Sequence, residues 1–97
     1  MIPFPKHIKL GGHTIKVVRA PGLVENESAF GMWDDGKLSI SVDAGLSNSL
    51  AWSTLLHEVL EAINSLAELG LEHNKIQCLE LLLYQALCSI LERGQVG

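Results

Sequence analysis

The chain has 97 residues, of which 47% are hydrophobic and 19% are charged, and its formal net charge is −4. This length accommodates one domain, residues 1–97, and the apolar fraction predicts a folded chain rather than a disordered one. The acidic balance argues against nucleic-acid binding, which needs a basic face. The N-terminus lacks the features of a signal peptide, and the longest apolar stretch, residues 79–91, is too short to span a bilayer. We therefore expect a cytoplasmic protein that does not associate with membranes.

The first part of the chain, residues 6–42, is predicted to form a small antiparallel sheet of three to four strands. Apolar residues alternate on both sides of Gly11-Gly12, which is typical of a tight hairpin or of one strand kinked at the glycines. A second pair of alternating stretches flanks Asp35-Gly36, a strong turn dipeptide, and indicates a further hairpin.

From about residue 47 the apolar residues recur with the 3.6-residue period of a helix. The first helix is expected to end near Gly70, where a capping glycine belongs, and the second to begin near His73. Because the linker is short, residues 47–93 are predicted to form an antiparallel helical hairpin. A sheet laid on this hairpin would give an α+β sandwich.

The most informative segment is the H-E-x-x-E pattern inside the first predicted helix. His57 and Glu61 are four residues apart, so they lie on one face of the helix and can bind one metal ion, with zinc as the expected cofactor. Glu58 occupies the position in which a zinc hydrolase keeps its general base.

Two interpretations of this pair stay open. On a helical wheel His57, Glu61, Asn64 and Glu68 lie opposite the apolar stripe. They could form a solvated polar face, on which His57 and Glu61 are an ordinary weak pair. They could instead hold a metal ion in a cleft between this helix and another element.

The third metal ligand has two candidates. His73 lies near the start of the second helix, where the helix dipole favours the neutral imidazole that a metal requires. It can reach the pair only if the first helix ends a turn before Gly70. Glu80, two turns further along, is the alternative. We prefer His73, because two imidazoles and one carboxylate leave a positively charged zinc site.

Two segments carry a resemblance to a known group of proteins. Residues 54–63, TLLHEVLEAI, followed by residues 71–77, LEHNKIQ, resemble small bacteriophage and prophage proteins related to minimal zincins. Residues 30–34 are similar to the hairpin that precedes the helix in such proteins. The resemblance covers residues 6–92, and its specific part is helical. It implies a minimal zincin-like fold in a protein of phage origin that acts in the cytoplasm of a bacterial host.

The resemblance also implies roles for individual residues. His57, Glu61 and His73 would bind one zinc ion, and Glu58 would be the general base of a peptidase-like metallohydrolase. The substrate would be a peptide or protein, which an edge strand near residues 38–42 could align by strand addition. The chain departs from H-E-x-x-H in having Glu61 where the second histidine stands.

The alternative function is a non-catalytic phage accessory or adaptor module with at most a structural metal. The second helix is rich in leucine and could bury part of its surface in a homo-oligomer. Cys78 and Cys88 lie roughly 15 Å apart along this helix, too far to pair with each other, and are expected to be buried thiols.

Overall fold

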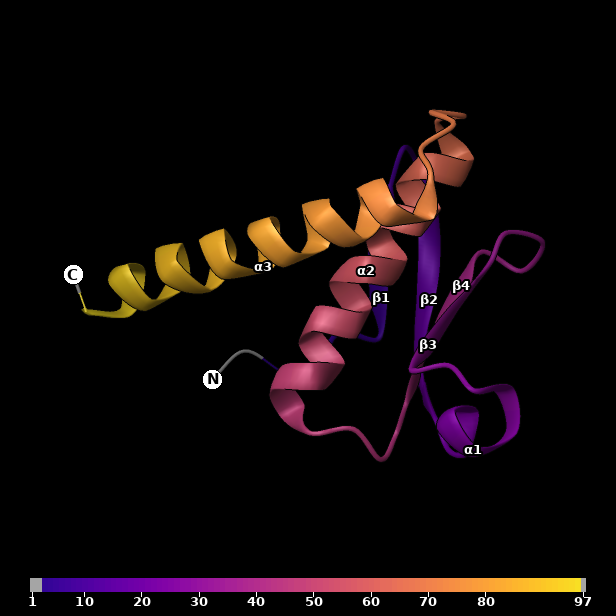
Figure 1. Ribbon diagram of the computed structural model, residues 1–97, viewed down its shortest axis with the longest axis horizontal. Coiled ribbons are helices and arrows are strands. Elements are labelled where there is room, and N and C mark those ends of the chain that lie inside the picture. Colours follow the sequence, from indigo (N-terminus) through magenta and orange to yellow (C-terminus); the bar gives the residue numbers. More distant parts are fainter. Residues whose placement is uncertain (1–2, 97) are drawn as a thin grey trace.

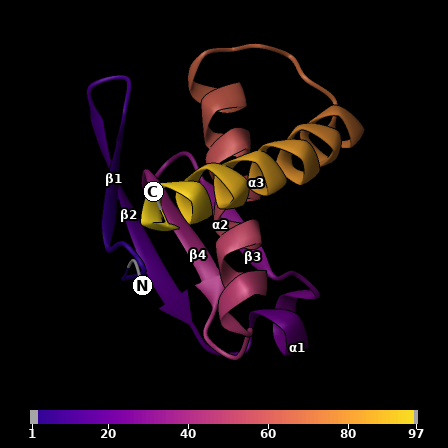
Figure 2. The same cartoon turned by 90° about the vertical axis from the view of Figure 1, so that its left-hand side faces the viewer.

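The computed structural model describes the backbone of residues 3–96 and the side chains of residues 3–92. The elements follow one another as β1 (His7–Leu10), β2 (His13–Ala20), α1 (Leu23–Glu27), β3 (Gly31–Asp34), β4 (Ser39–Asp43), α2 (Asn48–Leu66) and α3 (His73–Val96). The sheet covers one side of α2, and α3 crosses its other side (Figure 1, Figure 2). This arrangement confirms the predicted α+β class, with a small sheet followed by two helices.

The sheet is mixed, so the prediction of a wholly antiparallel sheet is wrong at its centre. The strand order is β1-β2-β4-β3, with antiparallel outer pairs and a parallel central pair, β2 and β4. Parallel neighbours need a crossover connection. Here α1 and β3 provide it, because they carry the chain to the far edge of the sheet before β4 returns beside β2.

Both predicted hairpins are present. Gly11 and Gly12 have φ angles of 56° and 85°, so the turn between β1 and β2 is left-handed at both positions. Such turns match the twist of two antiparallel strands, and glycine adopts them without steric cost. The alternative of one kinked strand is therefore wrong. The short helix α1 was not predicted from the sequence.

The core lies between the central strands and α2. Val17 of β2 is paired with Ile40 of β4, and the alternation along both strands turns every second side chain towards the helix. The buried cluster consists of Ile15, Val17, Ile40, Val42, Ala51 and Leu55. The apolar stripe of α2 is thus occupied by the sheet.

Helix α3 runs back along α2 in the predicted antiparallel sense, with His73 beside Glu61 and Tyr84 bonded to Ser49, but the two helices do not lie side by side along their length. It crosses α2 steeply and then projects away from the globule (Figure 1). Ile76 is its only buried apolar side chain among the described residues, and both cysteines, which we expected to be buried, are exposed. The physical reason is that α3 meets the polar face of α2, which offers little apolar surface to a leucine-rich helix. No helix within residues 3–96 has the length and hydropathy needed to cross a membrane.

Gly31, at the start of β3, lies too close to α2 to carry a side chain. A Cβ there would lie 2.7 Å from Cγ2 of Thr54 and 3.1 Å from Cγ of Glu58. We expect Gly31→Ala to lower the free energy of unfolding by about 1–3 kcal/mol, because overpacking pushes β3 away from α2. Gly36→Ala is the control, since its nearest neighbour would be Oδ1 of Asp34 at 3.4 Å. Urea unfolding measures both, and equal losses would contradict the prediction.

Candidate metal centre

The end of α2 decides whether α3 can reach the H-E-x-x-E segment. The helix ends at Leu66, one turn before Gly70. This early end is what His73 needs to reach His57 and Glu61. Glu68 and Gly70 then have φ angles of 51° and 68°, so the chain reverses through two left-handed residues. As a result, α3 begins at His73 beside α2 instead of beyond its end.

Asn64 holds this reversal in place. Its Oδ1 accepts a hydrogen bond of 2.8 Å from the backbone N–H of Leu71, and its Nδ2 donates one of 3.1 Å to the Leu71 carbonyl. The side chain therefore ties the last turn of α2 to the residues just before His73. On the helical wheel Asn64 lies on the polar face, but the sequence predicts no role for it. Its partner is the Leu71 backbone, and a backbone partner requires no particular residue type that the sequence could reveal.

The structure brings His57, Glu61 and His73 together. Nε2 of His57 lies 3.8 Å from Oε2 of Glu61, and Nδ1 of His73 lies 3.4 Å from the same oxygen. One ligand atom from each residue lies within 4.8 Å of the others. Donors bound to a tetrahedral zinc ion at 2.0–2.2 Å are about 3.4 Å apart, so small side-chain rotations would close the three atoms around an ion.

This face of α2 is sheltered. The His57 side chain is 15% exposed and that of Glu61 is 29% exposed, because α3 crosses over them. The rings of His57 and His73 meet edge to face, with centroids 5.2 Å apart. An open solvated face, the first of the two interpretations, does not describe these positions. His73 is 63% exposed and provides the side of the cluster that is open to solvent.

Glu80 lies at the other edge of the His57 ring. Its Oε1 is 3.8 Å from Nδ1 of His57, whereas Glu61 is nearest to Nε2. A carboxylate beside the nitrogen that does not bind the metal orients the imidazole and sets its tautomer in many metal sites. The cluster contains His73 as the third donor, and it places Glu80 where a small rotation would bring its carboxylate within hydrogen-bond distance of Nδ1 of His57.

Glu58 is buried between the cluster and the sheet. Its residue is 8% exposed, and its Cγ lies against Gly31 of β3. Burial, together with the negative charge of Glu61, raises the pKa of Glu58 to about 7. A carboxyl group with such a pKa exchanges its proton readily near neutral pH, which suits a general acid or base.

Asp43, at the end of β4, is a buried carboxylate with a structural role. It accepts hydrogen bonds from the backbone N–H groups of Val24, at 2.8 Å, and Gly45, at 2.7 Å. These bonds lower the pKa of Asp43, so the group stays ionised in the fold. These two hydrogen bonds connect α1 to the loop after β4. Asp43 is not part of the His57, Glu61 and His73 cluster.

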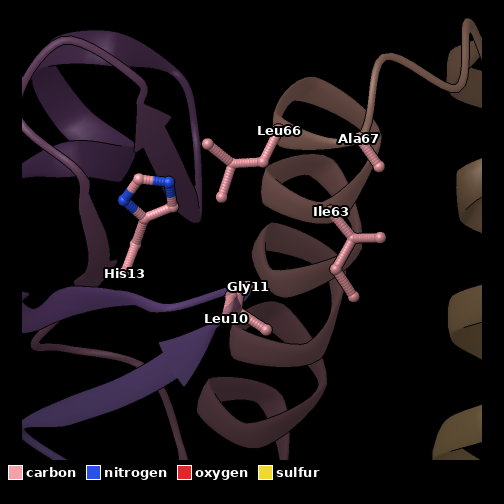
Figure 3. A pocket seen from close by; sticks show the side chains of 6 residues that line it. All are labelled: Leu10, Gly11, His13, Ile63, Leu66 and Ala67. Atoms are coloured by element: carbon pink, nitrogen blue, oxygen red, sulfur yellow. The ribbon is translucent and has the colours of Figure 1, made fainter.

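A hollow of about 210 Å³ lies elsewhere on α2, between the β1–β2 turn and the end of the helix. Figure 3 shows the His13 ring and the Leu66 side chain on facing walls of this hollow. Ile63 and Leu66 lie roughly opposite His57 on the helical wheel, so the hollow and the cluster occupy different sides of α2.

Comparison of the chain with protein-family models, with curated proteins and with solved structures finds no match. The resemblance to minimal zincins therefore stays a prediction.

The buried carboxyl of Glu58 should make the stability of the metal-free protein depend on pH. Its pKa rises from an ordinary value of 4.5 to about 7 in the fold, so the folded state binds the proton more tightly. The free energy of unfolding should then fall as the pH rises from about 4.5 to about 7. Since some contact with water remains, the expected loss is on the order of 1–2 kcal/mol.

Urea unfolding in the presence of a chelator, with the wild type and Glu58→Gln compared at each pH, measures this effect. The variant cannot ionise at this position, so its stability should be the less pH-dependent of the two. A wild type that gains stability relative to the variant as the pH rises would contradict the prediction.

The role of Asn64 can be tested separately. Asn64→Ala removes both hydrogen bonds to Leu71 and should lower the free energy of unfolding by about 1–2 kcal/mol. It should also raise amide hydrogen exchange around residues 68–73, because the reversal is no longer held. Asn64→Asp keeps the acceptor for the Leu71 N–H and should give a smaller effect. If amide hydrogen exchange is unchanged in Asn64→Ala, the turn is stable without this side chain, which would contradict the prediction.

Proposed function

We propose that this protein is a zinc-dependent metallohydrolase of the peptidase type, in which His57, Glu61 and His73 bind the metal and Glu58 is the general base. The observation that carries the proposal is the convergence of three donor side chains from two helices within 4.8 Å. Imidazole nitrogen and carboxylate oxygen are the donors that zinc takes in catalytic sites, and three protein ligands leave a fourth position open.

The residues around the cluster support a hydrolytic reaction. A bound zinc ion would supply Lewis acidity, polarising a carbonyl and lowering the pKa of water. Glu58 would accept a proton from the attacking water and return it to the leaving amine. Burial keeps its pKa near neutrality in the metal-free protein, and Glu80 would hold the His57 ring in the orientation that binding needs.

The position of β3 supports an extended peptide as substrate. Residues 38–42, which we first expected to align a substrate, belong mostly to β4, and β4 is paired on both sides. That expectation is wrong. β3 is one of the two edge strands; it contacts α2, and its Gly31 lies against Glu58. A peptide added to the outer edge of β3 would run beside the general base.

The alternative is a non-catalytic accessory or adaptor module whose metal is structural. It is favoured by the exposed leucines of α3, which suit an interaction surface better than a catalytic one. Phage origin and a place in the bacterial cytoplasm belong to both proposals, and they rest on the resemblance alone.

Elemental analysis of protein purified without a histidine tag tests the metal site. We expect about one equivalent of zinc, lost in His57→Ala and in Glu61→Ala and retained in His7→Ala, which alters an exposed histidine of β1. The zinc-bound protein should also resist thermal unfolding better than the same protein in chelator. A wild type that binds no divalent ion, with a melting temperature that chelator does not change, would contradict the proposal.

A peptide library read by mass spectrometry tests the activity. Glu58→Gln should keep its zinc and lose roughly 10²–10⁴-fold in the rate of cleavage, because it removes the base and spares the ligands. Zinc binding by a wild type that cleaves nothing would reject the hydrolase and favour the adaptor with a structural ion. Cleavage that Glu58→Gln leaves unchanged would reject Glu58 as the base.

A further inference from the structure

Helix α3 leaves much of its apolar surface uncovered. Of the thirteen large hydrophobic side chains that are exposed in the described part of the chain, seven lie on α3, and they are 39–67% exposed. Monomeric proteins rarely expose a continuous apolar patch of more than a few hundred Å². The projecting half of the helix lies clear of the sheet and of α2 (Figure 1, Figure 2).

Four exposed residues form a narrow stripe along this helix. Leu79, Leu83, Ala86 and Ile90 are spaced by four, three and four residues, so they lie within an arc of about 60°. The spacing reads the same in both directions. An antiparallel second copy would therefore set Leu79 against its Ile90 at the two ends and Leu83 against its smaller Ala86 at the centre.

The protein's own α2 does not cover this stripe. The side of α3 that faces α2 carries Ile76, Glu80 and Tyr84, and the hydroxyl of Tyr84 donates a hydrogen bond of 3.2 Å to the Ser49 carbonyl. That side is about a quarter turn away from the stripe. The stripe is thus accessible while α3 keeps its contacts with α2.

The absence of charge on the stripe makes this face compatible with a second copy of the chain. The chain as a whole carries a net charge of −4, so most surfaces of two copies repel each other. Residues 81–91 contain no charged side chain, and the stripe presents no charge that a basic or acidic partner would recognise. Two copies can meet at this face without burying an unpaired charge.

The exposed area is sufficient for a modest interface. The apolar side chains on the stripe and its flanks present on the order of 500 Å² in each copy, so a symmetric pair would bury about 1,000 Å², the lower limit for a specific interface. We propose that two copies of this chain form a symmetric dimer through antiparallel packing of their α3 helices. The dimer does not depend on the metal site, because His73 and Glu80 face α2.

The first test is the mass of the full chain in solution, measured by sedimentation over a range of concentrations. The wild type should approach twice 10.5 kDa as its concentration rises. Ile90→Glu places a charge on the stripe and should weaken the dimer at least tenfold. Leu81→Glu is the matched control: the residue is 67% exposed, against 64% for Ile90, but it lies on the opposite side of the helix and should leave the dimer unchanged.

Circular dichroism should show the same helix content in both variants. A wild type that stays monomeric at every concentration would overturn the proposal, and so would an equal loss in both variants. Failure to bind zinc would leave this result untouched, so the dimer and the proposed function can fail independently.

The second test is the direction of the helices, in chains whose Cys78 and Cys88 are replaced by serine. A mixture of Leu79→Cys and Ile90→Cys chains should form a disulfide-linked dimer under mild oxidation, because the antiparallel arrangement sets these positions together. Each variant alone should stay uncrosslinked. Crosslinking of each variant with itself, without a mixed disulfide between Leu79→Cys and Ile90→Cys chains, would indicate parallel helices and overturn the proposed arrangement.

Discussion

Helix α2 is covered on two opposite sides by different parts of the chain. Its apolar side packs Ala51 and Leu55 against the central strands, and burial of such side chains supplies most of the favourable free energy of a small domain. Its polar side, with His57 and Glu61, is covered by α3. Enclosing polar groups in this way is unfavourable unless they find partners. The position of α2 therefore forms the apolar core on one side. On the other side it encloses polar groups that need partners.

The groups on that polar side are only loosely paired with one another. His57 lies between two carboxylates at distances longer than a hydrogen bond, and Glu58 is forced towards its neutral form by burial and by Glu61. A divalent cation would favour ionised carboxylates and neutral imidazoles and would satisfy these groups together. Asp43 shows the contrast, because each of its carboxylate oxygens already accepts a hydrogen bond from a backbone N–H.

Helix α3 serves two surfaces that do not overlap. One side brings His73 and Glu80 to α2, and another presents the exposed apolar stripe. The steep crossing makes this division possible: α3 contacts α2 from His73 to Tyr84, and the rest of the helix projects away from it. The stripe and the side chains that face α2 therefore lie on different sides of one helix, so a partner on the stripe leaves His73 and Glu80 where they are.

The local elements were determined by the sequence itself. Gly11-Gly12 and Asp35-Gly36 mark the two hairpins, and the four-residue spacing of His57 and Glu61 sets them on one helical face, because such features depend on residues close together in the chain. Long-range packing sets the parallel pairing of β2 and β4, the steep crossing of α3 over α2, and the position of Glu80 beside the other nitrogen of His57. These outcomes depend on contacts between distant segments, where several arrangements bury similar apolar area and local turn chemistry does not choose among them.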